Sequence, residues 1–597
     1  MKLNILKYAI AALPLVGFSA CLDFDTPSDE FSDTEKELDP IVYQGDADKL
    51  DFSVQPTEEE VDQALAALDN YLGNFITAQY YLAGGKNGAP PQEHQWQYIF
   101  SLNTDCYAGY FTLINSAFMA GTIPTTYSYQ RDYCEGPYGR FLDMKSYLGN
   151  LLNIEASNDV VEIKAMALLL FDIAAQENTD LYGSIPYVDH KGNKEVNPFE
   201  FLPGRDIYAS IIQNLDDIDA CLSNFSNRPQ WYQDKINQVL AGKDVLTQNK
   251  DIETWRRMAN SLKLRMAMHV VKTMPDRAKQ WAEEAVASGV IESKIHETGV
   301  FGATGMPVVH PLKVILCDWN DSRLNASFVS LLTSLNHPWV DYLLAKNTNP
   351  IINQVTGDVV EPNTMIVGVR AGDFMEGSQQ YFSNMRYAYS RMTPDHDDFL
   401  YMPVYIFKWA EMDFLRAEGA LRGWAMGGDP ESFYNRGILN ADCGERHEEY
   451  LITGEYDSRV ADYMAQTEAT PYTYVDPMDY SNNMESLTKI GVKWDNSDDN
   501  EVKLEKIITQ KYIAMFPYSY EAWTEMRRTG YPKIFPVKNP GIADGSLQYG
   551  DLIRRMHLPH GDTQAGQEDV NNTGLEAIGG PDLYSTRVFW DTEASNF

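Results

Sequence analysis

The chain has 597 residues and a formal net charge of −37, with 85 acidic residues against 48 Lys and Arg. Such a charge repels nucleic acid phosphates and favours solubility, so nucleic acid is excluded as a partner. Hydrophobic residues make up 44 % of the sequence and aromatic residues 12 %, led by 36 Tyr, which is enough for a large core.

The amino end has the pattern of a secretory signal. Lys2 and Lys7 precede an apolar run that ends at Phe18 and is too short to span a bilayer as a mature helix. Phe18-Ser19-Ala20-Cys21 resembles a lipobox, although Phe18 stands where leucine is usual; an ordinary signal cleaved after Ala20 is the alternative. We expect a lipoprotein signal peptide over residues 1–20, lipid on Cys21, and a flexible, acidic tether over residues 21–45.

Amphipathic helix patterns follow in series. Thr57-x-x-Glu60 predicts a capping box that opens a helix, and Asp159-x-x-Glu162 predicts another. Apolar residues then recur every three or four positions in Ile207–Ile218, Ala259–Val270, Ala278–Ala285 (ending at Gly289) and Phe407–Leu421. Ala-rich faces alternate with large-residue faces, as in tetratricopeptide-type helix pairs, but no strict repeat consensus occurs. The sequence predicts a mostly α-helical scaffold of paired helices with minor β structure.

Four stretches lack helical periodicity: 84–103, 294–325, 348–398 and 444–499. Loops of this length in a compact chain are usually functional or packed on the scaffold. We call these stretches the excursions. No Gly/Ser/Pro linker divides the chain after Leu50, so we expect one α-helical nutrient-binding domain over residues 46–597, although length alone suggests about four domains.

The stretch from Ile507 to Ile534 is the most informative segment. Ile508, Tyr512 and Met515 form one helical face, Pro517 interrupts it, and a second face includes Trp523. Gly530 stands where this second helix should end, with Pro532 beyond it. Arg527-Arg528 is interpreted as a structural anchor that pairs with carboxylates.

This stretch resembles the carboxyl-terminal signature of the SusD/RagB family of nutrient-binding lipoproteins of the bacterial outer membrane. Four further blocks resemble that family in the same order: 167–187 with Leu-Tyr-Gly-Ser-Ile-Pro-Tyr, 254–268, 410–424, and 579–591. The resemblance implies a TPR-like (tetratricopeptide-like) SusD fold, a cell-surface lipoprotein in the outer membrane, and a SusC-like TonB-dependent transporter as partner in nutrient uptake. It implies nutrient binding without catalysis; we expect carbohydrate binding from the aromatic residues of the excursions, and neither a cofactor nor a metal.

Ligand-binding residues are expected on the excursions. An aromatic face attracts the C–H groups of a sugar ring, and Asn, Asp or Arg side chains bind its hydroxyls in fixed directions. Leu335-Asn-His-Pro-Trp339 replaces an Asn-Asp-Pro-Arg that many relatives carry. The candidates are Trp96, Tyr98, Trp319, Asn320, Asp321, Trp339, Tyr381, Arg386 and Tyr389. In contrast, Trp255, Trp281, Trp409 and Trp523 lie on helix patterns and are predicted core residues.

Other clusters indicate no particular chemistry. Asp395–Asp398 and Asp476–Asp479 lack EF-hand spacing, and His557-Leu-Pro-His560 lacks the zinc-protease pattern. Besides Cys21, five cysteines occur, none in metal-binding spacing, and we interpret them as small buried hydrophobes, with a Cys106–Cys134 bridge as the alternative.

Two other functions stay open. A family member of this kind could bind peptides or another non-sugar nutrient. Because 85 acidic residues supply many carboxylate pairs, a surface glycoside hydrolase on a helical scaffold is the second alternative. The excursion aromatics favour an oligosaccharide.

Overall fold

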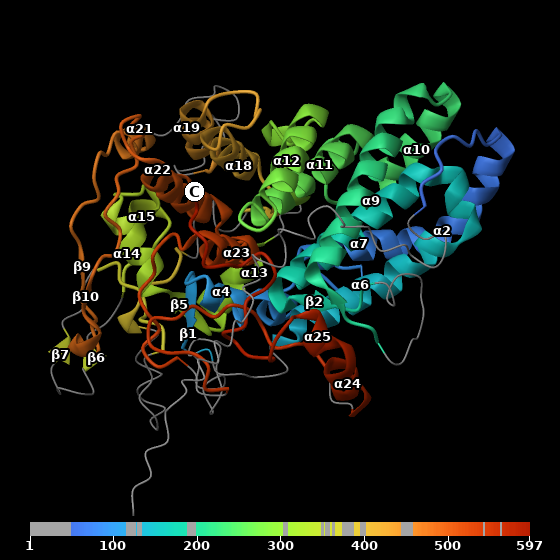
Figure 1. Ribbon diagram of the computed structural model, residues 1–597. Helices are drawn as coiled ribbons and strands as arrows, with labels where there is room; N and C mark the ends of the chain where they lie inside the picture. The colour runs from blue at the N-terminus through green and yellow to red at the C-terminus, as the bar shows by residue number, and fades with distance from the viewer. Residues whose placement is uncertain are drawn as a thin grey trace, which may run out of the picture.

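The computed structural model describes residues 49–597 except residue 87 and the segments 115–126, 128–133, 188–198, 302–308, 348–350, 353–358, 361–364, 373–386, 394–401, 443–457, 541–543 and 561–563. Long helices lie side by side across the molecule, and short strands and turns gather along one edge of this helical layer (Figure 1). The mostly helical prediction is confirmed. The predicted signal peptide and tether (1–20 and 21–45) lie outside the described residues.

The first half of the layer is built from five helices, each packed on the next or on a close neighbour. Their bounds are Glu58–Leu82 (α2), Gly136–Asn153 (α6), Val161–Tyr182 (α7), Gly204–Asn224 (α9) and Gln230–Lys243 (α10). The capping box of α2 is confirmed, because Thr57 accepts from the Glu60 amide and Glu60 accepts from the Thr57 amide. Every residue of α7 is buried, so this helix is the central member of the layer.

The second half continues the layer toward the carboxyl end (Figure 1). Its helices are Ile252–His269 (α11), Pro275–Ser288 (α12), Trp409–Leu421 (α18), Pro430–Asn440 (α19), Asn500–Met515 (α22) and Ser519–Thr529 (α23). The helix break at Pro517 is confirmed, and Gly530 caps α23 with a φ of +81°, a left-handed conformation that favours glycine. Trp255 and Trp523 are buried as predicted.

Two sequence predictions of helix starts are wrong. Asp159 lies in a 3₁₀ turn, Glu155–Val160, and Glu162 makes no cap because its buried carboxylate binds Arg228 at 2.9 Å and the Tyr232 hydroxyl. Phe407 belongs to a strand, and helix α18 begins only at Trp409. In both places a tertiary contact decides where the helix begins.

Short helices and turns occur in the excursions and in other segments that connect the long helices. The short helices are Glu93–Trp96 (α3), Thr104–Tyr107 (α4), Pro311–Lys313 (α13), Ala326–Ser334 (α14), Trp339–Tyr342 (α15), Ser458–Met464 (α21), Gln564–Asp569 (α24) and Leu575–Ala577 (α25). Single π turns cover Gln97–Ser101, Val314–Asp318 and Val570–Gly574, and further 3₁₀ turns cover Phe225–Asn227, Lys294–His296 and Tyr480–Asn482.

The strands of the described residues form two-stranded antiparallel ladders. They pair Phe111–Leu113 (β1) with Ser322–Leu324 (β5), Ser184–Ile185 (β2) with Leu202–Pro203 (β3), Thr298–Val300 (β4) with Val404–Phe407 (β8), Ile351–Ile352 (β6) with Val359–Val360 (β7), and Thr473–Tyr474 (β9) with Met484–Glu485 (β10). In the first ladder Thr112 lies opposite Arg323. The β1–β5 and β4–β8 ladders join segments far apart in sequence, whereas the other three ladders pair neighbouring segments.

A second, smaller core lies beneath the excursions. It contains Ile114, Ala326, Val367, Val369, Ala388, Tyr389, Tyr474, Met478 and Phe535, separate from the main core of the helical layer. The excursions are therefore packed structures with their own apolar support.

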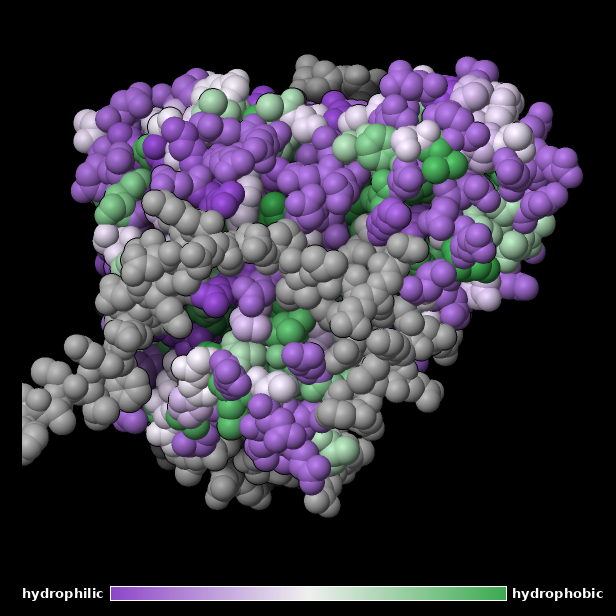
Figure 2. Space-filling view, turned by 45° about the vertical axis from the view of Figure 1, so that its right-hand side comes forward, coloured by the Kyte–Doolittle hydropathy of each residue, from purple (hydrophilic) through white to green (hydrophobic). Residues whose placement is uncertain are grey.

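The visible surface of the helical layer is mainly hydrophilic, with hydrophobic residues in smaller groups between polar ones (Figure 2). Cys106, Cys134 and Cys221 are buried free thiols, so the interpretation as small hydrophobes is confirmed for them and the Cys106–Cys134 bridge is not formed. Among the described residues, no helix combines the length and the apolar run that a membrane span requires.

Candidate functional site

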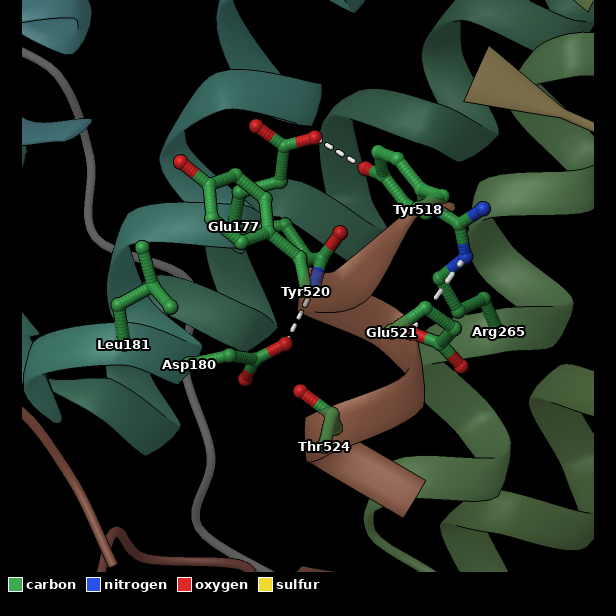
Figure 3. A pocket seen from close by; sticks show the side chains of 9 residues that line it. Glu177, Asp180, Leu181, Arg265, Tyr518, Tyr520, Glu521 and Thr524 are labelled. Atoms are coloured by element: carbon green, nitrogen blue, oxygen red, sulfur yellow. Dashed lines mark hydrogen bonds and ion pairs between the residues drawn. The ribbon is translucent and has the colours of Figure 1, made fainter. Parts of the chain in front are cut away.

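The first cavity lies inside the helical layer, between α7, α11 and α23 (Figure 3). Its volume of about 10 Å³ has room for about one water molecule. The residues that line it are all buried: Gln176, Glu177, Asp180, Leu181, Arg265, Tyr518, Tyr520, Glu521 and Thr524.

Charged groups around this cavity are matched with partners of opposite charge. Glu177 binds Arg140 and accepts from the Tyr518 hydroxyl. Arg265 forms a two-pronged pair with Glu411, at 2.7 and 2.8 Å, and its Nε lies 3.8 Å from Glu521. Buried ions need such partners, because an isolated charge is costly to remove from water.

Residues His269, Glu521 and Glu525 stand close enough together to hold a metal ion. The Lys511 ammonium, however, lies 2.6 Å from Glu521 and 2.9 Å from Glu525. The two carboxylates thus already bind a cation that the chain itself supplies.

The Arg527-Arg528 pair belongs to the same cluster. Arg528 binds Glu418 at 2.6 and 2.8 Å and Glu525 at 2.5 Å, while the Arg527 guanidinium lies 3.7 Å from the centre of the Trp523 ring. The interpretation of this pair as a structural anchor is confirmed. The cluster holds the helices together, and a separate cavity of about 340 Å³ adjoins it, lined in part by Lys272, Arg527 and Arg528.

Another cavity opens among the excursions and has a volume of about 290 Å³, near the lower end of the roughly 300–1,000 Å³ of small-molecule pockets. We call it the rim pocket. It is lined by Cys317, Asn320, Arg323, Ala345, Lys346, Asn347, Tyr387, Tyr389 and Arg391. Two of these residues, Asn320 and Tyr389, are among the candidates predicted from the sequence.

Asn320 and Arg323 support one another at the wall of the rim pocket. Arg323 Nη2 donates to Asn320 Oδ1 at 2.8 Å, and Arg323 Nη1 donates to the carbonyl oxygens of Leu316 and Ser322. Asn320 adopts a φ of +59°, a left-handed conformation that Asn tolerates better than most residues. The amide and the guanidinium are thereby held in fixed positions.

Hydrogen bonds join two further segments that line the pocket, 345–347 and 387–391. Ala345 N donates to Arg391 O at 2.7 Å, and Asn347 Nδ2 donates to Ala388 O at 3.0 Å. Arg391 Nη1 donates to Cys317 O at 3.2 Å and so joins them to the segment that contains Asn320. Burial raises the pKa of the Cys317 thiol, although Arg391 and Arg323 oppose this shift.

Two predicted aromatic residues are exposed to solvent. Tyr98 is 43 % exposed and Trp319 is 40 % exposed. Their segments are joined by a buried hydrogen bond of 2.6 Å from Gln97 Nε2 to Asp321 Oδ2. The side chain of Asp321 thus joins the two segments, and Tyr98 and Trp319 keep a solvent-exposed part.

Three other predicted residues face inward. Trp96 packs against Phe100 and His310, and Trp339 donates from Nε1 to the carbonyl oxygen of Asp442 at 3.0 Å. Tyr389 is 2 % exposed, and its hydroxyl donates to Asp476, which also accepts from Tyr474. These three residues fasten excursions to the cores, and Asp476 serves this network rather than a solvated loop.

The remaining predicted positions, Cys21, Tyr381 and Arg386, lie outside the described residues, as do Asp395–Asp398. The sequence analysis did not single out Arg323, Lys346, Asn347, Tyr387 or Arg391. Tyr387 and Arg391 stand in an Arg- and Tyr-rich stretch that could have drawn attention to them. Lys346 and Asn347 carry no such signal, because only the fold brings them to the pocket.

The fold and the rim pocket define a class of protein: a helical scaffold whose excursions present an open polar pocket and exposed aromatic rings. A family model described as Susd and RagB outer membrane lipoprotein matches residues 51–591. The chain therefore belongs to the SusD/RagB family, as the sequence analysis predicted. No curated protein matches the chain.

Solved structures agree with this assignment. A chitin-binding SusD homologue from Flavobacterium johnsoniae is 28 % identical, with a TM-score of 0.70 over 90 % of this chain and 100 % of that one. Two proteins of Bacteroides thetaiotaomicron VPI-5482, a SusD-like protein and a SusD homologue, are 26 % and 27 % identical. Each has a TM-score of 0.70 over 88 % of this chain, and 100 % and 99 % of their own lengths are covered.

Proposed function

We propose that this protein captures an oligosaccharide at the cell surface and delivers it to a SusC-like TonB-dependent transporter, without catalysis of its own. The observation that carries the proposal is the rim pocket: Asn320 lines it, and the adjacent residue Trp319 is exposed. The family is one of outer membrane lipoproteins, and a relative of the same fold is described as chitin-binding.

Capture rests on two kinds of contact. The exposed rings of Tyr98 and Trp319 offer faces on which the C–H side of a sugar can stack. Asn320 and Tyr387, in the rim pocket, offer an amide and a phenol that bind hydroxyl groups in fixed directions. Since the walls are tied by hydrogen bonds, little ordering is needed when the ligand binds.

Calorimetry tests the binding. Titration of an oligosaccharide into the protein without residues 1–21 should give a measurable heat of binding. Chromatography of the recovered sugar should show it unchanged. Trp319→Ala should weaken binding, while Trp231→Ala, at a partly buried position of α10, serves as a control for nonspecific loss. Time-dependent cleavage would instead establish the glycoside hydrolase, and uptake of peptides but no sugar would establish the non-sugar binder.

Location is tested separately. We propose that residues 1–20 are removed, that Cys21 carries lipid, and that residues 21–45 link it to the domain of residues 46–597, which faces the cell exterior. Labelled palmitate should be incorporated by the wild-type protein and not by Cys21→Ala. Protease added to intact cells should digest the wild-type domain; resistance to protease would contradict an outward orientation.

The transporter partner requires its own experiment. Extended faces of stacked helices provide large surfaces for a partner, and the helical layer is such a surface. Gentle detergent extraction of the outer membrane followed by affinity purification of this chain should recover a β-barrel transporter in a fixed ratio. Recovery of the chain alone under several detergents would argue against a stable complex.

A further inference from the structure

The rim pocket has an unusual charge for this chain. Acidic residues outnumber Lys and Arg by 85 to 48 in the sequence. The described residues that line the rim pocket nevertheless include three cations, Arg323, Lys346 and Arg391, and no carboxylate. The described lining of the pocket is thus positive, in a chain whose overall charge is strongly negative.

The carboxylates around the pocket have partners elsewhere. Asp318 binds Lys313 at 3.0 Å, Asp321 accepts from Gln97, and Asp476 accepts from the hydroxyls of Tyr389 and Tyr474. None of them forms an ion pair with a cation of the pocket in the described part of the chain. They therefore leave the positive charge of the pocket in place.

Lys346 and Arg391 have free capacity to bind an anion. Lys346 is exposed and makes no hydrogen bond or ion pair with the described residues. Arg391 uses Nη1 for the neutral carbonyl oxygen of Cys317, which keeps the guanidinium in the pocket without neutralising it. A guanidinium presents paired N–H groups that match two oxygens of an acidic group, and an ammonium adds a point charge.

We propose that the oligosaccharide bound here is acidic: its sugars carry carboxylates or sulfate esters, and Arg391 and Lys346 bind that group. This inference rests on the proposed function and specifies its ligand class. Asn320 Oδ1 accepts from Arg323 and Asn347 Oδ1 accepts from Met365 N, which leaves each amide oxygen a second lone pair for a neighbouring hydroxyl. A neutral sugar could bind these oxygens but would leave both cations without an anionic partner.

The overall charge of −37 does not prevent this recognition. At about 0.15 M salt, electrostatic interactions between exposed charges fall off over about 8 Å. An acidic group inside the pocket is within this distance of the two cations, whereas most of the acidic surface is screened. Binding should therefore be measured at physiological salt.

The test compares three trisaccharides by calorimetry on the full chain in detergent: a trigalacturonate, a sulfated trisaccharide and a neutral trisaccharide. We expect one of the two acidic probes to bind at least about tenfold more tightly than the neutral one, and the stronger of the two identifies the acidic group. Lys346→Gln and Arg391→Gln should each reduce affinity for that probe about tenfold and leave affinity for the neutral probe unchanged.

Lys313→Gln is the matched control, because Lys313 lies on the same excursion but pairs with Asp318 outside the pocket lining. It should leave affinity for the acidic probe unchanged. If Arg391→Gln fails to fold, the exposed Lys346→Gln still tests the inference.

The contrary results are distinct. Equal binding of neutral and acidic probes, insensitive to both variants, overturns the acidic ligand while the capture of sugars stands. A tetraglutamate peptide that binds more tightly than any sugar overturns the sugar class itself. Binding of no probe, by a chain that binds no neutral glycan either, overturns the proposed function.

Discussion

The core cavity and the rim pocket use similar side chains in opposite ways. Both are lined by arginine and tyrosine, but Arg265 in the core is paired with Glu411, whereas Arg391 at the rim contacts only a carbonyl oxygen among the described residues. The core cavity is lined by charges that are balanced and has room for about one water. The rim pocket is unbalanced and open. Charge balance, rather than residue type, distinguishes the structural cluster from the candidate binding site.

The largest effect should come from unbalancing the core. Glu521→Gln leaves Lys511 and His269 without the carboxylate they share, and breaking such a buried pair costs about 3–5 kcal/mol. Urea unfolding followed by circular dichroism measures this loss. Glu253→Gln is the control, because Glu253 is 43 % exposed in its pairs with Arg256 and Arg257 and should cost at most about 1 kcal/mol. Equal losses of unfolding free energy in the two variants would show that the buried ion pairs contribute no more to stability than the exposed ones.

The second effect compares two kinds of buried histidine. Burial opposes the charge of His269, but Glu521 and Asp180 outweigh it and raise the pKa from 6.5 to about 9. Burial lowers the pKa of His337 from 6.5 to about 3, so this ring is neutral. The stability from His269 is present below pH 6.5 and lost as the pH rises toward 9. The stability that His337 contributes is present above pH 6.5 and lost as the pH falls toward 3.

Unfolding free energies measured across pH should separate the two residues. His269→Gln should flatten the decline between pH 6.5 and 9, which amounts to on the order of 3 kcal/mol at most. His337→Gln should flatten the decline on the acidic side instead. If both variants change the same side of the profile, the assigned charge states are wrong.

The third effect concerns two tryptophans of the excursions. Trp339→Phe removes the hydrogen bond from Nε1 to the Asp442 carbonyl and should cost about 1–3 kcal/mol of stability. Trp319→Phe should change stability by at most about 0.5 kcal/mol, because Trp319 is 40 % exposed. Thermal unfolding of both variants provides the comparison, and a larger loss for Trp319→Phe would contradict these positions.

The smallest effect should come from the rim cations. Lys346→Gln should leave stability within about 0.5 kcal/mol of wild type, because this charge makes no ion pair with the described residues. Denaturant titration of the variant checks this. A loss similar to that of Glu521→Gln would mean that Lys346 supports the fold and would remove the contrast between the two cavities.

Sequence reasoning was most successful where periodicity applies. The faces of α9, α11 and α12 and the break at Pro517 follow from spacing, and Arg527-Arg528 was correctly interpreted as an anchor. It failed where a tertiary contact overrides a local signal, as when Arg228 binds the carboxylate of Glu162. Local capping patterns cannot reveal a partner 66 residues away.

The candidate site was only partly accessible from the sequence. A loop tryptophan that faces solvent and one that fastens the loop have the same local pattern, so Trp319 and Trp339 could not be told apart. The rim pocket combines residues from 317–323, 345–347 and 387–391, which meet through backbone hydrogen bonds such as Ala345 N to Arg391 O. No spacing rule predicts such a meeting.

The complete burial of α7 has a consequence for how the molecule opens. No face of this helix meets solvent, and it packs against α6 and α9. Its amide protons should therefore exchange with deuterium only when the whole domain comes apart, whereas those of peripheral turns exchange through local fraying. Deuterium exchange of the α7 amides thus measures global unfolding, and the exchange of every other segment can be compared with it to detect local opening.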